Sequence, residues 1–206
     1  IIICVPTPGE SCNATEIFNV INQVPSTMPV LIKSTVTPER LAQLVVEFPE
    51  HNICYSPEFL TAANADKDFA AQRFMIIGGD DPNHLWKTLF QSVLLDCTLY
   101  FDCSLAEASM AKYTINSFLS TKVGFFNQIY DICQKNGADF EIVRQMISHD
   151  SRLGASHTRV PGHDGRRGFG GACFPKDTKS FIEYANHLNT PITILEETVK
   201  YNDKIR

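Results

Sequence analysis

The sequence contains no paired cysteines, no long apolar run and no excess of basic residues. None of its seven cysteines forms a CxxC pair and their number is odd, which argues against a disulfide or zinc framework and favours reduced cytoplasmic thiols. No apolar run reaches the ~20 residues of a membrane-spanning helix, and we expect no secretion signal. Because acidic residues outnumber basic ones 23 to 18, a general nucleic-acid or anionic-membrane surface is not expected. We therefore expect a cytoplasmic protein with no metal site, no nucleic-acid partner and no membrane contact.

The glycine fingerprint of a dinucleotide-binding fold is also absent. Such a fold opens with a strand, a GxGxxG turn and a helix, followed roughly 20 residues later by an acidic residue. No GxGxxG occurs in the 206 residues, and the chain begins with Ile1, Ile2 and Ile3 in what we interpret as a buried strand. We therefore expect a piece of a longer protein that keeps only the second half of such a fold.

Residues 1–103 alternate short apolar runs with helical patterns, which predicts an α/β domain. Short apolar strands with helical crossovers are typical of a Rossmann-like parallel sheet covered on both faces. Helices are expected between the strands, such as Pro38 to Val46 behind an N-cap at Thr37, and Asn83 to Leu95. The expected strands are Ile1 to Val5, Pro29 to Ser34, Asn52 to Tyr55, Arg73 to Ile77 and Thr98 to Phe101.

Residues 104–206 predict an all-α domain that opens with one long helix. Ser104 to Glu107 form a capping box, and the next stop signal is Asn136-Gly137, which gives a helix of roughly 50 Å. One alternative is the core helix of a single domain. Because the apolar positions cover more than one face, we instead expect a helix shared with a second copy in a homodimer. These positions are Met110, Ile115, Phe118, Leu119, Val123, Phe125, Phe126, Ile129 and Ile132.

Three shorter helices are expected to follow. They run from Asp139 to Ser148, from Pro175 to Asn186 and from Pro191 to Tyr201. The last is predicted to have an N-cap at Thr190 and proline at its first position.

The densest chemical signal is the stretch Pro161 to Asp177. Five of the 11 glycines fall between 162 and 171, and such a loop lets backbone N–H groups approach a ligand closely. Cys173 follows just before a predicted helix start, with Lys176 nearby. Both features stabilise a thiolate, so we expect a lowered pKa and a nucleophilic sulfur. The alternative is a flexible surface loop with an incidental cysteine.

Other candidate residues follow from spacing and from strand ends. Lys112 and Asn116 are four residues apart on the long helix, so together they can donate to one oxyanion, although a solvated helix face explains the same spacing. Glu58 follows a predicted strand, where ligands bind in open α/β sheets. The same rule favours the segments Val5-Pro6-Thr7-Pro8 and Ser34-Thr35.

These segments carry a family resemblance. The phrases VPTP, KSTVTP, SPEFL, AKYTINSFLSTK and DGRRGFGGACFPKD, in this order, resemble the UDP-glucose/GDP-mannose dehydrogenase family, and the last phrase resembles the UDP-glucose branch. The resemblance implies a partial NAD-binding domain over 1–103 and a central helical dimerisation domain over 104–206, in a chain truncated at both ends. It also implies NAD-dependent oxidation of UDP-glucose or a related nucleotide sugar to the uronate.

The resemblance assigns a role to each candidate. Cys173 forms a thiohemiacetal and then a thioester, Lys112 and Asn116 hold the oxyanion, and Asp177, Glu58 and Thr35 manage protons and water. Arg152 reaches the substrate site of a neighbouring subunit. Substrate contacts are implied for Asp164, Gly165, Phe169, Gly170 and Gly171, and cofactor contacts for Val5, Pro6, Thr7, Pro8 and Lys176.

One departure from the family concerns Ala62. The family places a second glutamate four positions after the first, where this sequence has Ala62. With the expected truncation, this predicts weak NAD binding and little or no turnover by the chain alone. Alternatives remain a non-catalytic dimerisation remnant and a Cys-His hydrolase using His149, His157 or His163. The identity of the nucleotide sugar stays open.

Overall fold

The computed structural model describes residues 1–9, 12–60 and 64–206. The chain forms two compact units, Ile1–Tyr113 and Thr114–Arg206, which are described separately. Ala62, the position at which the sequence departs from its family, lies outside the described residues.

The first unit contains a five-stranded sheet in the order β1-β2-β3-β4-β5. All five strands were expected from the apolar runs, and the predicted α/β class is confirmed. β1 pairs in parallel with β2, β2 with β3, and β4 with β5. The strands are β1 (Ile2–Ile3), β2 (Val30–Ile32), β3 (Ile53–Tyr55), β4 (Phe74–Gly78) and β5 (Leu99–Cys103).

The prediction of a wholly parallel sheet is wrong at one junction. β3 and β4 are antiparallel, and their register pairs Tyr55 with Gly78, the last residue of each strand. The chain therefore re-enters the sheet after β3 in the reverse direction, and the two strands meet only at their carboxyl ends. Apolar runs predict strands but not the direction in which the chain returns, so this reversal could not be read from the pattern.

The central strands are buried on both faces, as expected. Val30 and Ile32 pack with α1 (Thr15–Ile21) and α2 (Pro38–Glu47), whereas Leu31 packs with α4 (Leu85–Gln91) on the other face. Successive side chains of a strand point to opposite faces, so a continuous apolar run serves both cores.

The helix starts in this unit follow local capping. Thr37 accepts a hydrogen bond from the backbone of Arg40, which confirms the predicted N-cap of α2. α4 begins later than the expected Asn83, because Asn83 and His84 have positive φ and the Asp81 carboxylate caps the helix instead. The remaining helical segments are α3 (Ala65–Ala70) and the 3₁₀ turn Pro82–His84.

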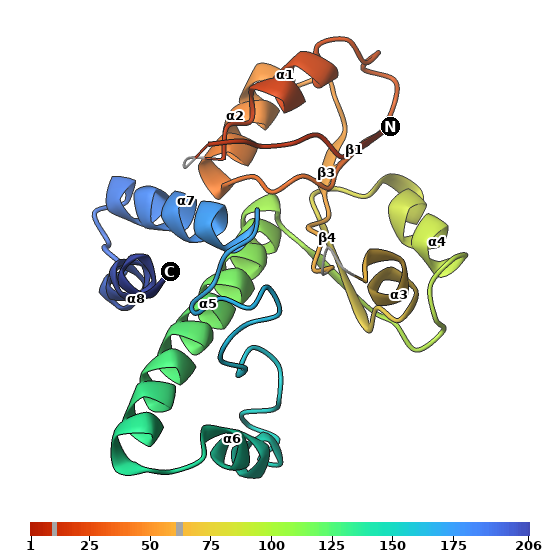
Figure 1. Cartoon of the computed structure of the whole chain (residues 1–206). Helices are drawn as coiled ribbons and strands as arrows, with labels where there is room; N and C mark the ends of the chain where they lie inside the picture. Colours follow the sequence, from red (N-terminus) through yellow and green to blue (C-terminus); the bar gives the residue numbers. More distant parts are fainter. Residues whose placement is uncertain (10–11, 61–63) are drawn as a thin grey trace. The chain divides into compact units, whose positions relative to one another are not determined.

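α5 (Leu105–Asn136) begins in the first unit and continues into the second. The capping box is confirmed, because the Glu107 carboxylate accepts from the Ser104 backbone N–H while the Ser104 hydroxyl accepts from that of Glu107. Gly137, at φ +77, ends the helix as expected. α6 (Phe140–Ser148) then packs back against α5, through Phe126, Cys133 and Phe140 (Figure 1).

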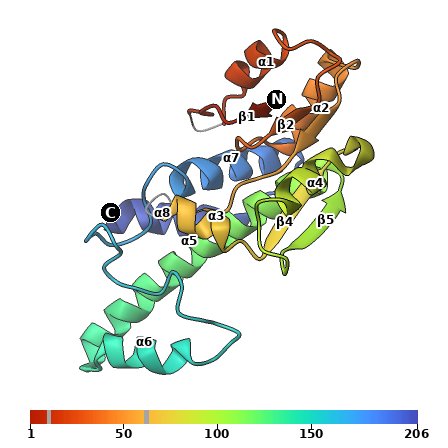
Figure 2. The ribbon, with the colours of Figure 1, turned by 90° about the vertical axis from the view of Figure 1, so that its right-hand side faces the viewer.

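The last two helices, α7 (Phe174–His187) and α8 (Thr193–Ile205), lie side by side (Figure 2). The predicted N-cap at Thr190 is wrong. α8 starts at Thr193, and the Thr190 hydroxyl donates to the carbonyl of Leu188. The Thr190 hydroxyl thus stabilises the turn that follows α7, and it does not cap α8.

Candidate active site

Cys173 occupies the N-cap position of α7 and is exposed. Its carbonyl accepts the first helical hydrogen bond, from the backbone N–H of Asp177, at 2.8 Å. By contrast, Cys54 is buried, and burial, aided by Asp81 and Asp80, raises the pKa of its thiol to about 12. Cys4 and Cys97 are also exposed, but neither follows a glycine-rich loop at a helix start.

Asp177 lies one turn into α7, and its side chain is only 1% exposed. One carboxylate oxygen accepts from the side-chain amide of Asn116 at 2.5 Å, and the other accepts from Lys176 Nζ at 2.8 Å. Three of the predicted site residues therefore meet around one buried carboxylate. In this arrangement Asn116 donates to Asp177, not to a free oxyanion position.

A second group of predicted residues meets in the first unit, around Glu58. Buried Lys112 donates from Nζ to the Glu58 carbonyl at 2.5 Å and lies over the Phe59 ring. Lys33, which the sequence analysis did not single out, forms an ion pair with the Glu58 carboxylate at 3.0 Å. The backbone N–H of Phe59 also donates to that carboxylate. Glu58 is thus held by Lys33, by Lys112 and by the backbone N–H of Phe59.

The carboxyl ends of β1, β2 and β3 lie at one edge of the sheet, because these strands are parallel. Thr35 and the Val5–Pro8 segment follow β2 and β1, and they are tied together by a 2.7 Å hydrogen bond from the Ser34 hydroxyl to the Val5 carbonyl. Dinucleotides bind at such edges. The Val5–Pro8 segment and Thr35 therefore lie at an edge that a ligand could reach, although the sequence has no GxGxxG turn for a pyrophosphate.

The glycine-rich loop has a defined conformation. Gly165, Gly168 and Gly171 have φ of +74, +71 and +77, which only glycine adopts without strain. Arg206 donates from its guanidinium to the Asp164 carboxylate. A Cβ at Gly170 would overlap that guanidinium. The loop backbone is thus shaped by its glycines and contacted by the Arg206 side chain.

Helices α5 and α8 anchor this loop through residues that the sequence analysis missed. Asn127 accepts from the backbone N–H of Gly168, and Asn202 from that of Phe169. Arg167 forms an ion pair with Asp131 at 2.7 Å. The partners of these contacts lie 33 to 41 residues apart in the sequence, and no local pattern identifies such pairs.

Arg152 is exposed beside an apolar groove of about 430 Å³. Its guanidinium pairs with Asp150 at 2.6 Å, and the groove is also lined by Phe118, Phe125 and Leu153. These three apolar side chains are 65%, 55% and 47% exposed. Phe118 and Phe125 of α5 therefore form, with Leu153, an exposed apolar surface beside Arg152.

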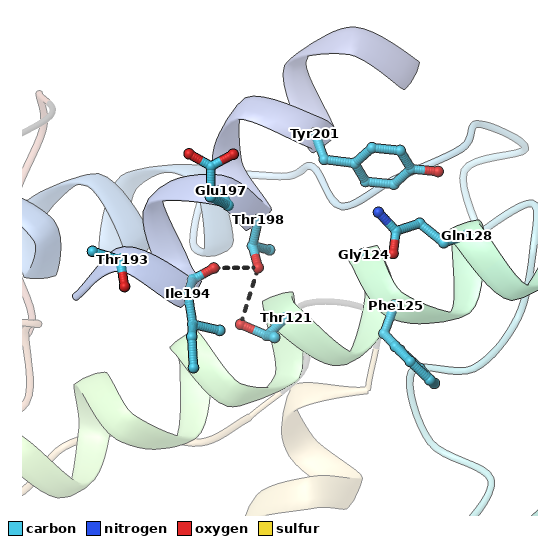
Figure 3. Close-up of a pocket in the computed structure, with 9 residues that line it drawn as sticks. All are labelled: Thr121, Gly124, Phe125, Gln128, Thr193, Ile194, Glu197, Thr198 and Tyr201. Carbon is cyan, nitrogen blue, oxygen red and sulfur yellow. Dashed lines mark hydrogen bonds between the residues drawn. The ribbon is translucent and has the colours of Figure 1, made fainter.

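A second hollow, of about 420 Å³, lies between α5 and α8 (Figure 3). The Thr198 hydroxyl donates to the Ile194 carbonyl at 2.8 Å and lies 3.5 Å from that of Thr121. Its lining holds none of the predicted site residues. The lining residues are Thr121, Gly124, Phe125, Gln128, Thr193, Ile194, Glu197, Thr198 and Tyr201.

His157, one of the three histidines that a Cys-His hydrolase could use, packs against the start of α7. The His157 ring packs against Phe174, with centroids 5.5 Å apart, and its Nδ1 is buried without a hydrogen-bond partner. Burial, and to a smaller extent the nearby Lys122 and His163, lower the pKa of His157.

None of the helices in residues 1–9, 12–60 and 64–206 combines the length and the apolar composition that a membrane span requires.

Comparison with known proteins identifies relatives of the whole chain. A family model described as "UDP-glucose/GDP-mannose dehydrogenase family, central domain" matches residues 106–204. UDP-glucose 6-dehydrogenase YwqF of Bacillus subtilis is 32% identical over 184 residues, which is 86% of this chain and 39% of the relative. UDP-glucose 6-dehydrogenase of Rickettsia typhi is 29% identical over 179 residues, 84% of this chain and 40% of the relative. The chain thus spans about two fifths of these curated relatives.

Solved structures agree on the fold. A UDP-glucose dehydrogenase from Pyrobaculum islandicum superposes with a TM-score of 0.83 at 26% identity, covering 98% of this chain and 50% of that one. GDP-mannose dehydrogenase from Pseudomonas aeruginosa superposes with a TM-score of 0.66 at 24% identity, covering 99% and 50%. At that lower identity the likeness concerns the fold alone.

Proposed function

The chain belongs to the UDP-glucose/GDP-mannose dehydrogenase family, and we propose that it is the part of a nucleotide-sugar 6-dehydrogenase that carries the catalytic thiol. The substrate is UDP-glucose or a related nucleotide sugar, and the product is the uronate. The observation that carries the proposal is the exposed Cys173 at the start of α7, one turn from a buried Asp177 that Asn116 holds. We assign 1–103 to a partial NAD-binding domain and 104–206 to a central helical domain.

Cys173 acts as the nucleophile. After a first hydride has left C6 of the sugar, the thiolate adds to the resulting aldehyde and forms a thiohemiacetal. Loss of a second hydride from that carbon gives a thioester, and water cleaves it to the carboxylate and the free thiol. NAD, when bound, supplies the acceptor for each hydride.

Donors near α5 stabilise the negative charge that develops on oxygen. Lys112 and Asn116 are placed one turn apart on this helix, and directed donors of this kind are worth several kcal/mol at an oxyanion. Without substrate, Lys112 donates to the Glu58 carbonyl and Asn116 donates to the Asp177 carboxylate. When the substrate binds, each residue donates to the substrate oxygen in place of that acceptor.

Three oxygen-bearing residues manage protons and water. Asp177 is held by Asn116 and Lys176, and it accepts the proton of the thiol or of the hydrolytic water. Glu58 and Thr35 lie past the ends of β3 and β2, where Glu58 is fixed by Lys33. A fixed carboxylate orients a water molecule without a reorganisation cost.

The substrate and NAD contact separate segments. The loop from Asp164 through Gly165, Phe169, Gly170 and Gly171 binds the sugar and nucleotide through its backbone, and its fixed conformation lowers the entropic cost of binding. NAD is held by Val5, Pro6, Thr7 and Pro8 at the sheet edge, and by Lys176.

A second copy of the chain completes the site. The exposed apolar side chains Phe118, Phe125 and Leu153 border the groove beside Arg152, and such a surface suits an isologous homodimer. In this dimer, Arg152 leaves its ion pair with Asp150 and binds the substrate held by the second copy. Cys4, Cys54, Cys97, Cys103, Cys133 and Cys173 form no disulfide within the described residues, which favours a cytoplasmic location.

The test is protection of Cys173 from iodoacetamide by UDP-glucose, followed by peptide mass spectrometry. Cys173 should label first among the thiols and should be slowed by saturating UDP-glucose. The exposed Cys97 serves as an internal control whose rate stays constant, and Cys54 should label last because its thiol is protonated. Equal labelling of Cys173 with and without UDP-glucose would refute a nucleotide-sugar site.

A further inference from the structure

Two buried asparagines lie on either side of the glycine-rich loop. Asn127 on α5 is 1% exposed and Asn202 on α8 is 4% exposed. They contact consecutive backbone positions, Gly168 and Phe169. Amides rarely occupy such buried positions unless their polar atoms are fully used.

Asn202 forms a two-sided hydrogen bond with one residue of the loop. Its side-chain oxygen accepts from the Phe169 N–H at 2.7 Å, and its side-chain NH₂ donates to the Phe169 carbonyl at 3.1 Å. This pairing satisfies both backbone groups of a residue that is 4% exposed. A Cβ at Gly168 would overlap the Asn202 side-chain oxygen, so the glycine is required for the close approach.

Asn127 fixes the preceding residues. Its side-chain oxygen accepts from the Gly168 N–H and from Arg167 Nε, each at 3.2 Å, while its NH₂ donates to the Val123 carbonyl of its own helix at 2.9 Å. Both polar atoms of its side chain are hydrogen-bonded. The loop backbone is therefore held from α5 at Gly168 and from α8 at Phe169.

Ring packing carries this anchor to the thiol. The Phe169 ring makes an edge-to-face contact with Phe174, with centroids 6.3 Å apart. Phe174 is the first residue of α7 and directly follows Cys173. The Phe169 ring therefore links the anchored loop backbone to the start of α7, next to Cys173.

We propose that Asn202 and Asn127 are positioning residues that hold the backbone of Gly168 and Phe169. Through the contact between Phe169 and Phe174, they place Cys173 against the glycine-rich loop. The inference rests on the proposed function for the identity of the ligand. The anchoring itself can be measured without any ligand.

The experiment compares three variants of the chain. Asn202→Leu keeps the side-chain size and removes both hydrogen bonds, whereas Asn202→Asp keeps the acceptor for the Phe169 N–H. Thr198→Val is the matched control, since its hydroxyl donates within α8, one turn earlier. Amide hydrogen exchange at Phe169 and the rate of Cys173 alkylation, with and without UDP-glucose, are the measurements.

In Asn202→Leu, Phe169 exchange should accelerate about tenfold and ligand-free Cys173 alkylation should fall toward the rate of Cys97. The UDP-glucose concentration for half-protection should rise about tenfold. Asn202→Asp should recover part of the exchange protection, and Thr198→Val should match wild type. Should Asn202→Leu fail to fold, Gly168→Ala, whose Cβ meets the Asn202 oxygen, must give the same exchange and alkylation changes.

Wild-type exchange and alkylation in Asn202→Leu, or equal changes in Thr198→Val, would overturn the positioning role. If UDP-glucose protects Cys173 in no variant, including wild type, the proposed function fails. In that case, the amide exchange rate of Phe169 and the alkylation rate of Cys173 without ligand still test the positioning role.

Discussion

Replacement of Asn116 by leucine tests the arrangement around the buried Asp177. Asn116 is 6% exposed and donates to a carboxylate that is itself 1% exposed. Leucine has the same branched heavy-atom skeleton and is somewhat larger, so the change removes the hydrogen bond without opening a cavity. A hydrogen bond to a charged group contributes about 1.5–3 kcal/mol to stability.

Lys176 cannot compensate for the loss. It already pairs with the other Asp177 oxygen, and its own side chain is 21% exposed, so solvent screens part of that attraction. We therefore expect Asn116→Leu to lower the free energy of unfolding by about 2 kcal/mol. Asn116→Asp should be worse at neutral pH, because it opposes two carboxylates in a buried site. It should recover on mild acidification, when a proton is shared between them.

The assay is urea unfolding followed by far-ultraviolet circular dichroism, which reports the helical content of the chain. Thr121→Val, on the same helix, is the control and should change stability by less than about 0.5 kcal/mol. An Asn116→Leu chain as stable as wild type would refute the reasoning. So would an Asn116→Asp chain that is as stable as Asn116→Leu at neutral pH.

Two further predictions concern acid stability and assembly. The Arg167 guanidinium, by hydrogen bonding, holds the pKa of Asp131 below its usual value. The stability that this ion pair adds is fully present above about pH 4 and is lost as the pH falls through the lowered pKa of Asp131. In Asp131→Asn, stability to urea should therefore fall less steeply in acid than in wild type. Parallel curves of stability against pH for the two proteins would contradict this. Phe118→Asp should convert a homodimer to a monomer in light scattering, because it places a charge in the apolar surface of α5. Val46→Asp, at a position 80% exposed in the first unit, should not change the measured mass.

Periodicity and capping chemistry were sufficient for most of the secondary structure. The strand runs and the long helix depend on local patterns, and the Ser104–Glu107 capping box depends on residues three positions apart. Each such signal lies within one turn or one strand. For the same reason the β3–β4 reversal was missed, since it depends on how the chain returns to the sheet.

In the candidate site, too, local sequence signals identified some residues, whereas residues that act through long-range contacts were missed. Cys173 and Asp177 were identifiable because a glycine-rich loop, a thiol and a helix start adjoin in the sequence. Asn127 and Asn202 were not, because each contacts the loop from more than 30 residues away. Lys33 was overlooked for a similar reason, since Glu58, its partner, lies 25 positions further along the chain (58 − 33).

The most direct test of the central claim is to observe the bond between Cys173 and the substrate carbon. The chain is mixed with the 6-aldehyde of UDP-glucose, labelled with ¹³C at C6, and examined by carbon NMR. The account predicts a thiohemiacetal signal, distinct from the aldehyde and its hydrate, that is lost in Cys173→Ala and retained in the control Cys97→Ala. Only the free aldehyde and hydrate in the wild-type spectrum, or an adduct that persists in Cys173→Ala, would contradict it.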